Sequence, residues 1–286
     1  MSSSQSALAI EPVFPSPLLA SLQRRHSAWY FWTLAYAVLA GLCLVAGLFD
    51  ERLFQGVSLW HKPFKFALSL AVYFVTLAWF ANLVPQAYFD TTKGKWLTAI
   101  PIVCAFLEMA YILIQAARGE ASHFNYSSNF YSAMYSLMGV GAVLLVAMCL
   151  WMGISILRHR GSSNLWVLSV GIGLIGTFVL GGGFGGYLGS AGQHWVGGNA
   201  TDAGGLPIVH WSRTGGDLRV AHFFGIHAMQ IVPLLGAGLV WLQNKERVSA
   251  SLARLILISA SIAFAAFCTA TFTQALRGAP LSLIHI

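Results

Sequence analysis

The chain has 286 residues, of which 57% are hydrophobic and 9% are charged, and its mean hydropathy is +0.70. A soluble domain carries roughly 25% charged residues, so this composition excludes an ordinary soluble fold and predicts a membrane protein. The formal net charge is +7, and the charges lie between apolar runs rather than in basic blocks with interleaved aromatic residues. We therefore expect the lipid bilayer as a partner and exclude nucleic-acid binding.

The two ends of the chain differ from the apolar middle. Residues 1–27 are polar and contain Ser and Pro, which predicts a flexible N-terminal segment without a cleaved signal peptide. A seven-helix transmembrane domain is expected over residues 28–278. Residues 279–286 form a tail whose final letters, LSLIHI, resemble a non-native addition, so His285 receives no functional role.

Seven apolar runs of about 20 residues predict seven transmembrane helices, because only helices and closed barrels satisfy their backbone in lipid. Trp and Tyr flank several of these runs, as expected at a membrane interface. The Gly-rich segment 189–219 is predicted to be an ordered loop over the outer face. The predicted fold is thus an all-α polytopic bundle, with helices at approximately 29–49, 64–84, 96–117, 130–157, 165–188, 220–243 and 254–276.

The distribution of Lys and Arg gives an orientation. With the N-terminus inside, nine of these residues lie in inner segments and seven in outer segments. The inner loops are short and mostly basic, whereas the outer loops mix basic with acidic residues. This pattern favours a cytoplasmic N-terminus and an outside C-terminus.

The third apolar run carries a polar stripe. Glu108, Tyr111, Gln115 and Arg118 share one helical face at 100° per residue. Glu108 is the only carboxylate deep in any apolar run, and an ionisable group within the membrane indicates a functional site. The Gly-rich run GGGFGGYLG, residues 181–189, favours close helix packing, with an unwound helix end as the alternative.

The stretch RVAHFFGIHAMQ, residues 219–230, opens the sixth run with two histidines and a glutamine. His222 and His227 are five residues apart, about 140° around a helix, so they do not share a face. His227 and Gln230 do share one, and at about 1.5 Å per residue they reach a depth similar to that of Glu108. These three side chains are expected to form a polar pocket open to the outer side.

Three functions remain open from these residues. The first is a membrane redox protein that binds haem b or a transition metal, with His227 and His222 as cofactor ligands, His61 and His123 as further metal ligands, and Glu108 and Gln230 as catalytic or proton-handling groups. The second is a proton-coupled transporter or a sensor of a small molecule or lipid, with Arg118, Arg213 and Arg219 attracting an anion. The third is a structural or assembly protein whose polar groups only fix helix packing.

Three segments, HKPFKFALSL (61–70), QAARGEASHFN (115–125) and HWSRTGGDLRVAHFFGIHAMQ (210–230), resemble an uncharacterised family of bacterial multi-pass membrane proteins. The resemblance covers roughly residues 28–278 and implies a location in the cell inner membrane. It implies no activity and transfers no catalytic residue.

Overall fold

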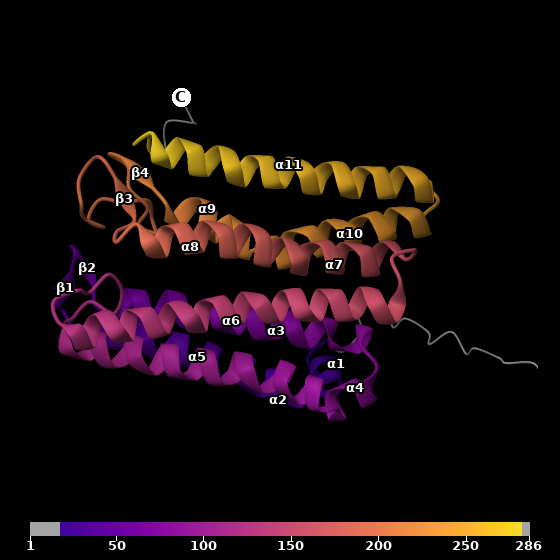
Figure 1. The fold of residues 1–286 in the computed structure, drawn as a ribbon, viewed down its shortest axis with the longest axis horizontal. Coiled ribbons are helices and arrows are strands. Elements are labelled where there is room, and N and C mark those ends of the chain that lie inside the picture. Colours follow the sequence, from indigo (N-terminus) through magenta and orange to yellow (C-terminus); the bar gives the residue numbers. More distant parts are fainter. Residues whose placement is uncertain (1–17, 282–286) are drawn as a thin grey trace, which may run out of the picture.

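The computed structural model describes residues 18–281 and is an elongated bundle of roughly aligned helices (Figure 1). Six described helices are long and apolar enough to cross a membrane, and a bent helix pair supplies a seventh span. The all-α polytopic fold predicted from the sequence is confirmed. The spans are α2 (Ser27–Phe49), α3 (His61–Phe80) with η1 (Ala81–Leu83), α5 (Thr92–Arg118), α6 (Asn129–Arg160), α7 (Leu165–Gly176) with η2 (Thr177–Gly182) and α8 (Gly183–Ser190), α9 (Arg219–Ile226) with α10 (Ala228–Asn244), and α11 (Ala250–Leu276).

The remaining elements are short. Two antiparallel pairs of strands, β1 with β2 and β3 with β4, lie at one end of the bundle together with the loop 119–128 (Figure 1). We call this end the cap end. The segment 189–219 is ordered there, as predicted. Helix α1 occupies part of the segment predicted to be flexible, and its residue Leu22 is buried. These elements are α1 (Leu18–Arg25), α4 (Gln86–Asp90), β1 (Leu53–Phe54), β2 (Val57–Ser58), β3 (Trp195–Val196) and β4 (Gly216–Asp217).

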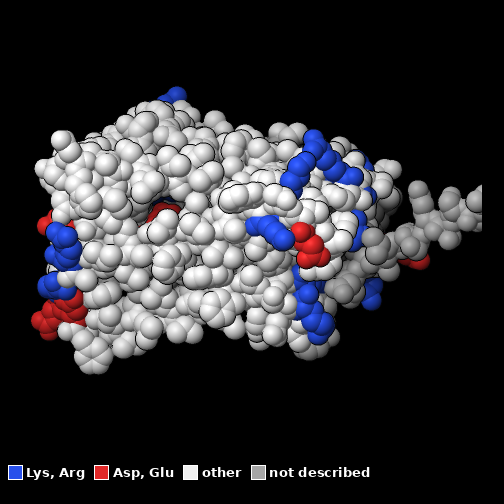
Figure 2. Space-filling view, turned by 60° about the horizontal axis from the view of Figure 1, so that its bottom comes forward, with Lys and Arg blue, Asp and Glu red and all other residues white. Residues whose placement is uncertain are grey.

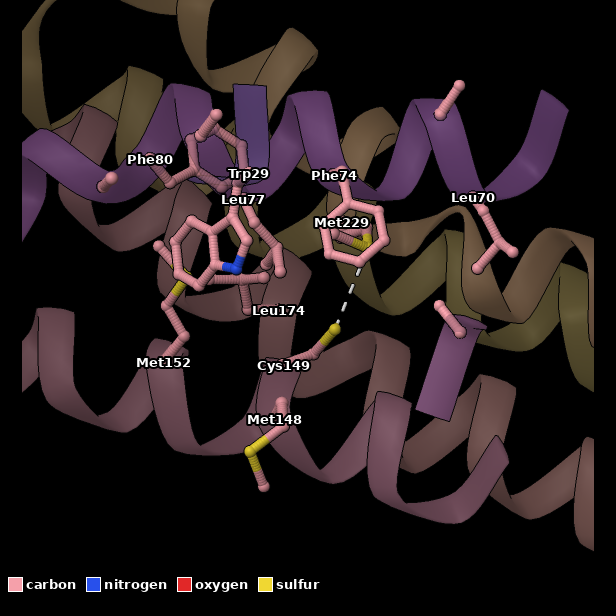
Figure 3. Packing of buried hydrophobic residues seen from close by; sticks show 14 of the residues in the cluster. Trp29, Leu70, Phe74, Leu77, Phe80, Met148, Cys149, Met152, Leu174 and Met229 are labelled. Atoms are coloured by element: carbon pink, nitrogen blue, oxygen red, sulfur yellow. Dashed lines mark hydrogen bonds between the residues drawn. The ribbon is translucent and has the colours of Figure 1, made fainter. Parts of the chain in front are cut away.

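The largest core joins α2, α3, α6, α7 and α10 (Figure 3). Phe74 of α3, Cys149 of α6 and Met229 of α10 meet there, with 3.9 Å between Cys149 Sγ and Met229 Sδ. Lipid tails are as apolar as these side chains, so close packing and interhelical hydrogen bonds hold such helices together.

Polar groups at the end opposite the cap serve as helix caps and ties. His26 Nδ1 accepts a hydrogen bond from Trp29 N at the start of α2, and His26 Nε2 lies 3.1 Å from Thr98 Oγ1. Burial lowers the pKa of His26 to about 4, so the ring is neutral at physiological pH and keeps its acceptor. The Arg160 guanidinium donates to the carbonyls of Asn82 and Leu83.

The span 165–190 is distorted where it crosses the bent pair. Residues 177–182 form the π-helix η2, and α9 meets α10 at an angle of 47°. A Cβ added at Gly181 would lie 3.0 Å from Ile226 Cα, and one added at Gly225 would lie 2.8 Å from Gly181 N. The Gly-rich run therefore permits close packing, as predicted, and the helix is locally widened into a π-turn rather than unwound.

Candidate functional site

Three ionisable side chains from three separate segments converge in the cap-end half of the bundle. Glu108 lies on α5, Lys62 lies in the first turn of α3, and His123 lies in the loop 119–128. His123 Nε2 is 4.0 Å from Glu108 Oε1, and Lys62 interacts electrostatically with both groups. The Lys62 ammonium also lies 6.0 Å from the centroid of the Phe66 ring, a cation–π distance.

The local sequence explains how α5 and its following loop bring these groups together. Glu108, Ile112 and Gln115 are buried on one face of α5, following the helical period. Gly119 then ends the helix in the left-handed conformation, with φ of 75°, which favours glycine. Gln115 Nε2 donates to the carbonyl oxygen of Ala121, so the loop folds back over the helix end and places its histidine beside the carboxylate.

A buried phenol adds a fourth polar group to this region. Tyr36 of α2 interacts electrostatically with Glu108, and its hydroxyl is buried without a hydrogen-bond partner. Glu108 is only 8% exposed, and its carboxylate has the His123 ring as an ion-pair partner at 4.0 Å. The Tyr36 ring lies 5.6 Å from the ring of Trp32 and 5.8 Å from that of Phe74. We call Tyr36, Lys62, Glu108 and His123 the Glu108 site.

Buried polar atoms in proteins are nearly always hydrogen-bonded, and leaving one unpaired costs about 1–3 kcal/mol. The Tyr36 hydroxyl, which has no partner within the described residues, is therefore unusual. Such a cost is retained where the groups serve a function.

The electrostatic balance of the Glu108 site is close to neutral. Burial, and secondarily the Lys62 ammonium, hold the pKa of His123 well below its usual range. His123 is thus uncharged at physiological pH, and the formal charges of Lys62 and Glu108 cancel.

The flank of the bundle that carries α2 and α5 is almost entirely uncharged, and its cap-end half is hollowed (Figure 2). An acidic side chain is visible at the bottom of this hollow (Figure 2). Glu108 is the only Asp or Glu within the described spans. A shallow groove of about 650 Å³ lies elsewhere, along α11, and is lined mainly by small side chains such as Ala266, Ala270 and Thr273.

A second polar chain connects α3 with the break between α9 and α10. Thr76 Oγ1 donates to Val72 O, and Gln230 Nε2 donates to Thr76 Oγ1. The Gln230 amide oxygen must then accept the bond from His227 Nδ1, at 3.1 Å. This series of hydrogen bonds fixes the His227 ring with its proton on Nδ1 and a lone pair on Nε2.

His222 is fixed in the same tautomer by a different acceptor. Its Nδ1 lies 3.0 Å from Gly181 O, and a carbonyl can only accept. His222 therefore ties α9 to the π-helix η2, whereas His227 ties the helix break to α3. In the described part of the chain, no hydrogen bond or ion pair joins Glu108 to His227 or Gln230. The single pocket expected from the sequence stays a prediction.

The loop 189–219 is held by a network of charged residues, which we call the cap network. Arg219 donates to Asp202 at 2.8 Å and to Asp217 at 2.7 Å, and His194 Nε2 lies 3.3 Å from Asp202 Oδ1. These hydrogen bonds and the Arg219 cation hold the pKa of Asp202 well below its usual range, although burial opposes them. Asp217 also accepts from Ser212 N and so anchors the loop to itself.

Two side chains at the start of α3 contact backbone carbonyls of the same loop. His61 Nε2 lies 2.6 Å from Ile208 O, and Lys65 Nζ donates to Val209 O at 3.2 Å. The His61 ring also contacts the ring of His210, with 4.2 Å between the centroids. The loop thus covers the cap end of α3, next to the first turn that carries Lys62.

The predicted ligand residues therefore lie at separate places. His61 contacts the loop 189–219, which we call the cap loop, and His123 lies at Glu108. His222 bonds to Gly181, and His227 bonds to Gln230. Within residues 18–281, no three His, Cys, Asp or Glu side chains gather closely enough to hold a metal ion. The metal and haem interpretation stays a hypothesis.

The predicted anion-attracting arginines have different surroundings. Arg219 is neutralised by Asp202 and Asp217 within the cap network. Arg118 is exposed and donates to Tyr131 Oη, and Arg213 is exposed on the loop.

Sequence reasoning missed Tyr36 and gave Lys62 no role in a site. For Tyr36, a phenol near the middle of an otherwise apolar run is a usable signal in the sequence. Asp217, two residues before Arg219, is a usable signal for the ion pair that neutralises this arginine.

Comparisons with protein-family models, with curated proteins and with solved structures find no match to this chain.

Proposed function

We propose that this membrane protein is a sensor that binds a small molecule or lipid at the Glu108 site. The observation that supports the proposal is the buried Glu108 carboxylate, which lies 4.0 Å from His123 and interacts electrostatically with Lys62 and with Tyr36, whose hydroxyl is unpaired. A ligand with hydrogen-bonding groups would pair with these atoms. Its affinity would increase because the free protein already bears the free-energy cost of leaving a buried polar atom unpaired.

A sensor fits this arrangement better than a carrier. A carrier needs polar groups that lead from its site to both membrane faces. At the end opposite the cap, His26 bonds to Thr98 and Arg160 bonds to backbone carbonyls, so these groups act as ties between elements. Lys62, Glu108 and His123 lie in the cap-end half.

We expect Glu108→Gln to weaken ligand binding while the protein stays folded. The substitution keeps the size of the side chain but removes a charge-assisted hydrogen-bond acceptor, which corresponds to a loss of tenfold to a hundredfold in affinity. Thermal unfolding in nanodiscs, screened against water-soluble acids, amines and alcohols and against single-chain amphiphiles, measures this. A ligand at 100 times its Kd stabilises the wild type by about 2.7 kcal/mol.

Glu120→Gln is the matched control, because Glu120 is an exposed carboxylate at the same end of the bundle. We expect this variant to respond to ligands as the wild type does. The proposal is wrong if no compound stabilises the wild type, or if Glu108→Gln is stabilised equally by every compound that does.

A haem or metal function is a second proposal, favoured by the tautomers of His222 and His227. A metal-binding histidine usually donates its second ring N–H to a fixed acceptor, and both residues do so through Nδ1. Each would then offer Nε2 to haem iron or to a transition metal. We expect a Soret band or stoichiometric metal in protein purified from cells supplied with both; a colourless and metal-free preparation would overturn this proposal.

The location also stays a proposal. The loop charges and the resemblance of three segments support a multi-pass protein of the cell inner membrane with a cytoplasmic N-terminus and an outside C-terminus. The cap end would then face outward.

A further inference from the structure

We infer that the ligand of the Glu108 site is a single-chain amphiphile with an uncharged, hydrogen-bonding head group, and that it enters sideways from the membrane leaflet at the cap end. This inference rests on the proposed function and adds the chemistry and the route of the ligand.

The route follows from what surrounds the site. Towards the cap end, His123 lies over Glu108 and packs against Phe66, with 5.3 Å between the ring centroids. The cap loop is bonded to His61 and Lys65 at the start of α3. In contrast, the hollow with an acidic side chain at its bottom opens on the uncharged flank of α2 and α5 (Figure 2). That flank faces lipid in any membrane-spanning arrangement of these helices.

The buried face of α2 is apolar on both sides of Tyr36. The buried face of α2 carries Tyr36 and then only small residues towards the cap end, namely Ala40 and Cys43. Towards the other end, the Trp32 and Phe106 rings meet between α2 and α5, with 6.1 Å between their centroids. The side chains on both sides of Tyr36 along α2 are thus apolar, so the part of a ligand that lies next to them would have to be apolar.

The charge balance determines the head group. Lys62 and Glu108 have opposite formal charges, and His123 lies 4.0 Å from Glu108, so a charged head would bring an unbalanced charge into a low-dielectric site. An alcohol or a primary amide brings none. It can donate to the Glu108 carboxylate, and it can accept from the Tyr36 hydroxyl, which has no partner within the described residues.

Photolabelling in nanodiscs tests this inference with a defined probe, a sixteen-carbon alcohol that carries a diazirine and an alkyne. We expect labelled peptides from α2 and α5. Hexadecanol and hexadecanamide should compete with the probe, whereas hexadecanoate and hexadecylamine should compete at least tenfold more weakly.

A tyrosine series separates recognition from folding. Tyr36→Phe removes a hydroxyl that has no protein partner, so we expect equal or greater stability together with about fivefold weaker binding of the probe. Tyr73→Phe is the control, because the Tyr73 hydroxyl donates to Leu145 O. This variant should lose stability and keep the affinity of the wild type.

The outcomes distinguish the two proposals. Tighter competition by a charged amphiphile, or a label spread evenly over all spans, would overturn the inference. Binding that depends on Glu108 but is seen only with water-soluble compounds would overturn it and leave the proposed function standing. If neither class of compound binds, both proposals fail.

Discussion

Replacing Arg219 with leucine is expected to destabilise the protein by about 3–5 kcal/mol, the usual cost of removing one partner from a buried ion pair. Arg219 donates hydrogen bonds to Asp202 and Asp217, which are only 8% and 3% exposed, and also to His210 O. Without the guanidinium, two carboxylates stay buried with no cation beside them. SDS-induced unfolding of the purified protein measures the loss.

The expected loss also has a local signature. The cap loop is tied to itself through Asp217 and Ser212, and to α9 through Arg219. We therefore expect Arg219→Leu to make residues 191–218 sensitive to limited proteolysis in proteoliposomes under conditions in which the wild type resists. Protection equal to that of the wild type would show that other contacts hold the loop.

Arg213→Leu is the matched control, because this arginine belongs to the same loop and is exposed. We expect it to change stability by no more than about 0.5 kcal/mol. Adding Asp217→Asn to Arg219→Leu should recover part of the loss, since it removes one of the two unpaired charges. An Arg219→Leu variant within 1 kcal/mol of the wild type would contradict the importance given to the network.

The seven spans could be predicted because hydropathy and helical period are local properties. The same period placed Glu108 and Gln115 on the buried face of α5, and the structure agrees. The contacts of these residues could not be predicted. In lipid, helix pairing depends on shape and on a few polar contacts between distant segments, and no local pattern states that Tyr36 of α2 meets Glu108.

The break before α10 shows a second limit. Pro233 lies inside α10 and would ordinarily mark the kink, since proline removes a backbone donor. The structure bends at His227, six residues earlier, where Thr177 Oγ1 bonds to Ile226 O and accepts from Met229 N. A side chain from another helix satisfies the freed backbone groups, and this contact depends on the packing of η2 against α9.

The Glu108 site and the helix break have one structural element in common. Helix α3 carries Lys62 at its start and Thr76 further along, and Thr76 accepts from Gln230, whose amide oxygen accepts from His227. A ligand that displaced α3 at the Glu108 site would therefore act on the hydrogen bonds at the bend. A sensor requires such a mechanical connection between its site and a second conformation.

The crossing of η2 with α9 is expected to tolerate no side chain at Gly225. A Cβ there would lie 2.8 Å from Gly181 N and 2.8 Å from Leu180 C, both of them backbone atoms that cannot rotate away. The two helices would have to separate, which would lengthen the bond from His222 Nδ1 to Gly181 O. We expect Gly225→Ala to cost about 3 kcal/mol, the upper part of the range for overpacking, and Gly225→Val to prevent folding.

Gly183→Ala is the control for this crossing, because Gly183 follows the π-helix in the same span and a Cβ there would meet no atom within 4 Å. Alanine has the higher helix propensity, so we expect this variant to match the wild type or to gain up to about 1 kcal/mol. SDS-induced unfolding of the three variants gives the comparison. Equal stability of Gly225→Ala and Gly183→Ala would mean that η2 and α9 are not held in contact at this point. The connection between the bend and the rest of the bundle would then have to run through Thr76 and Gln230 alone.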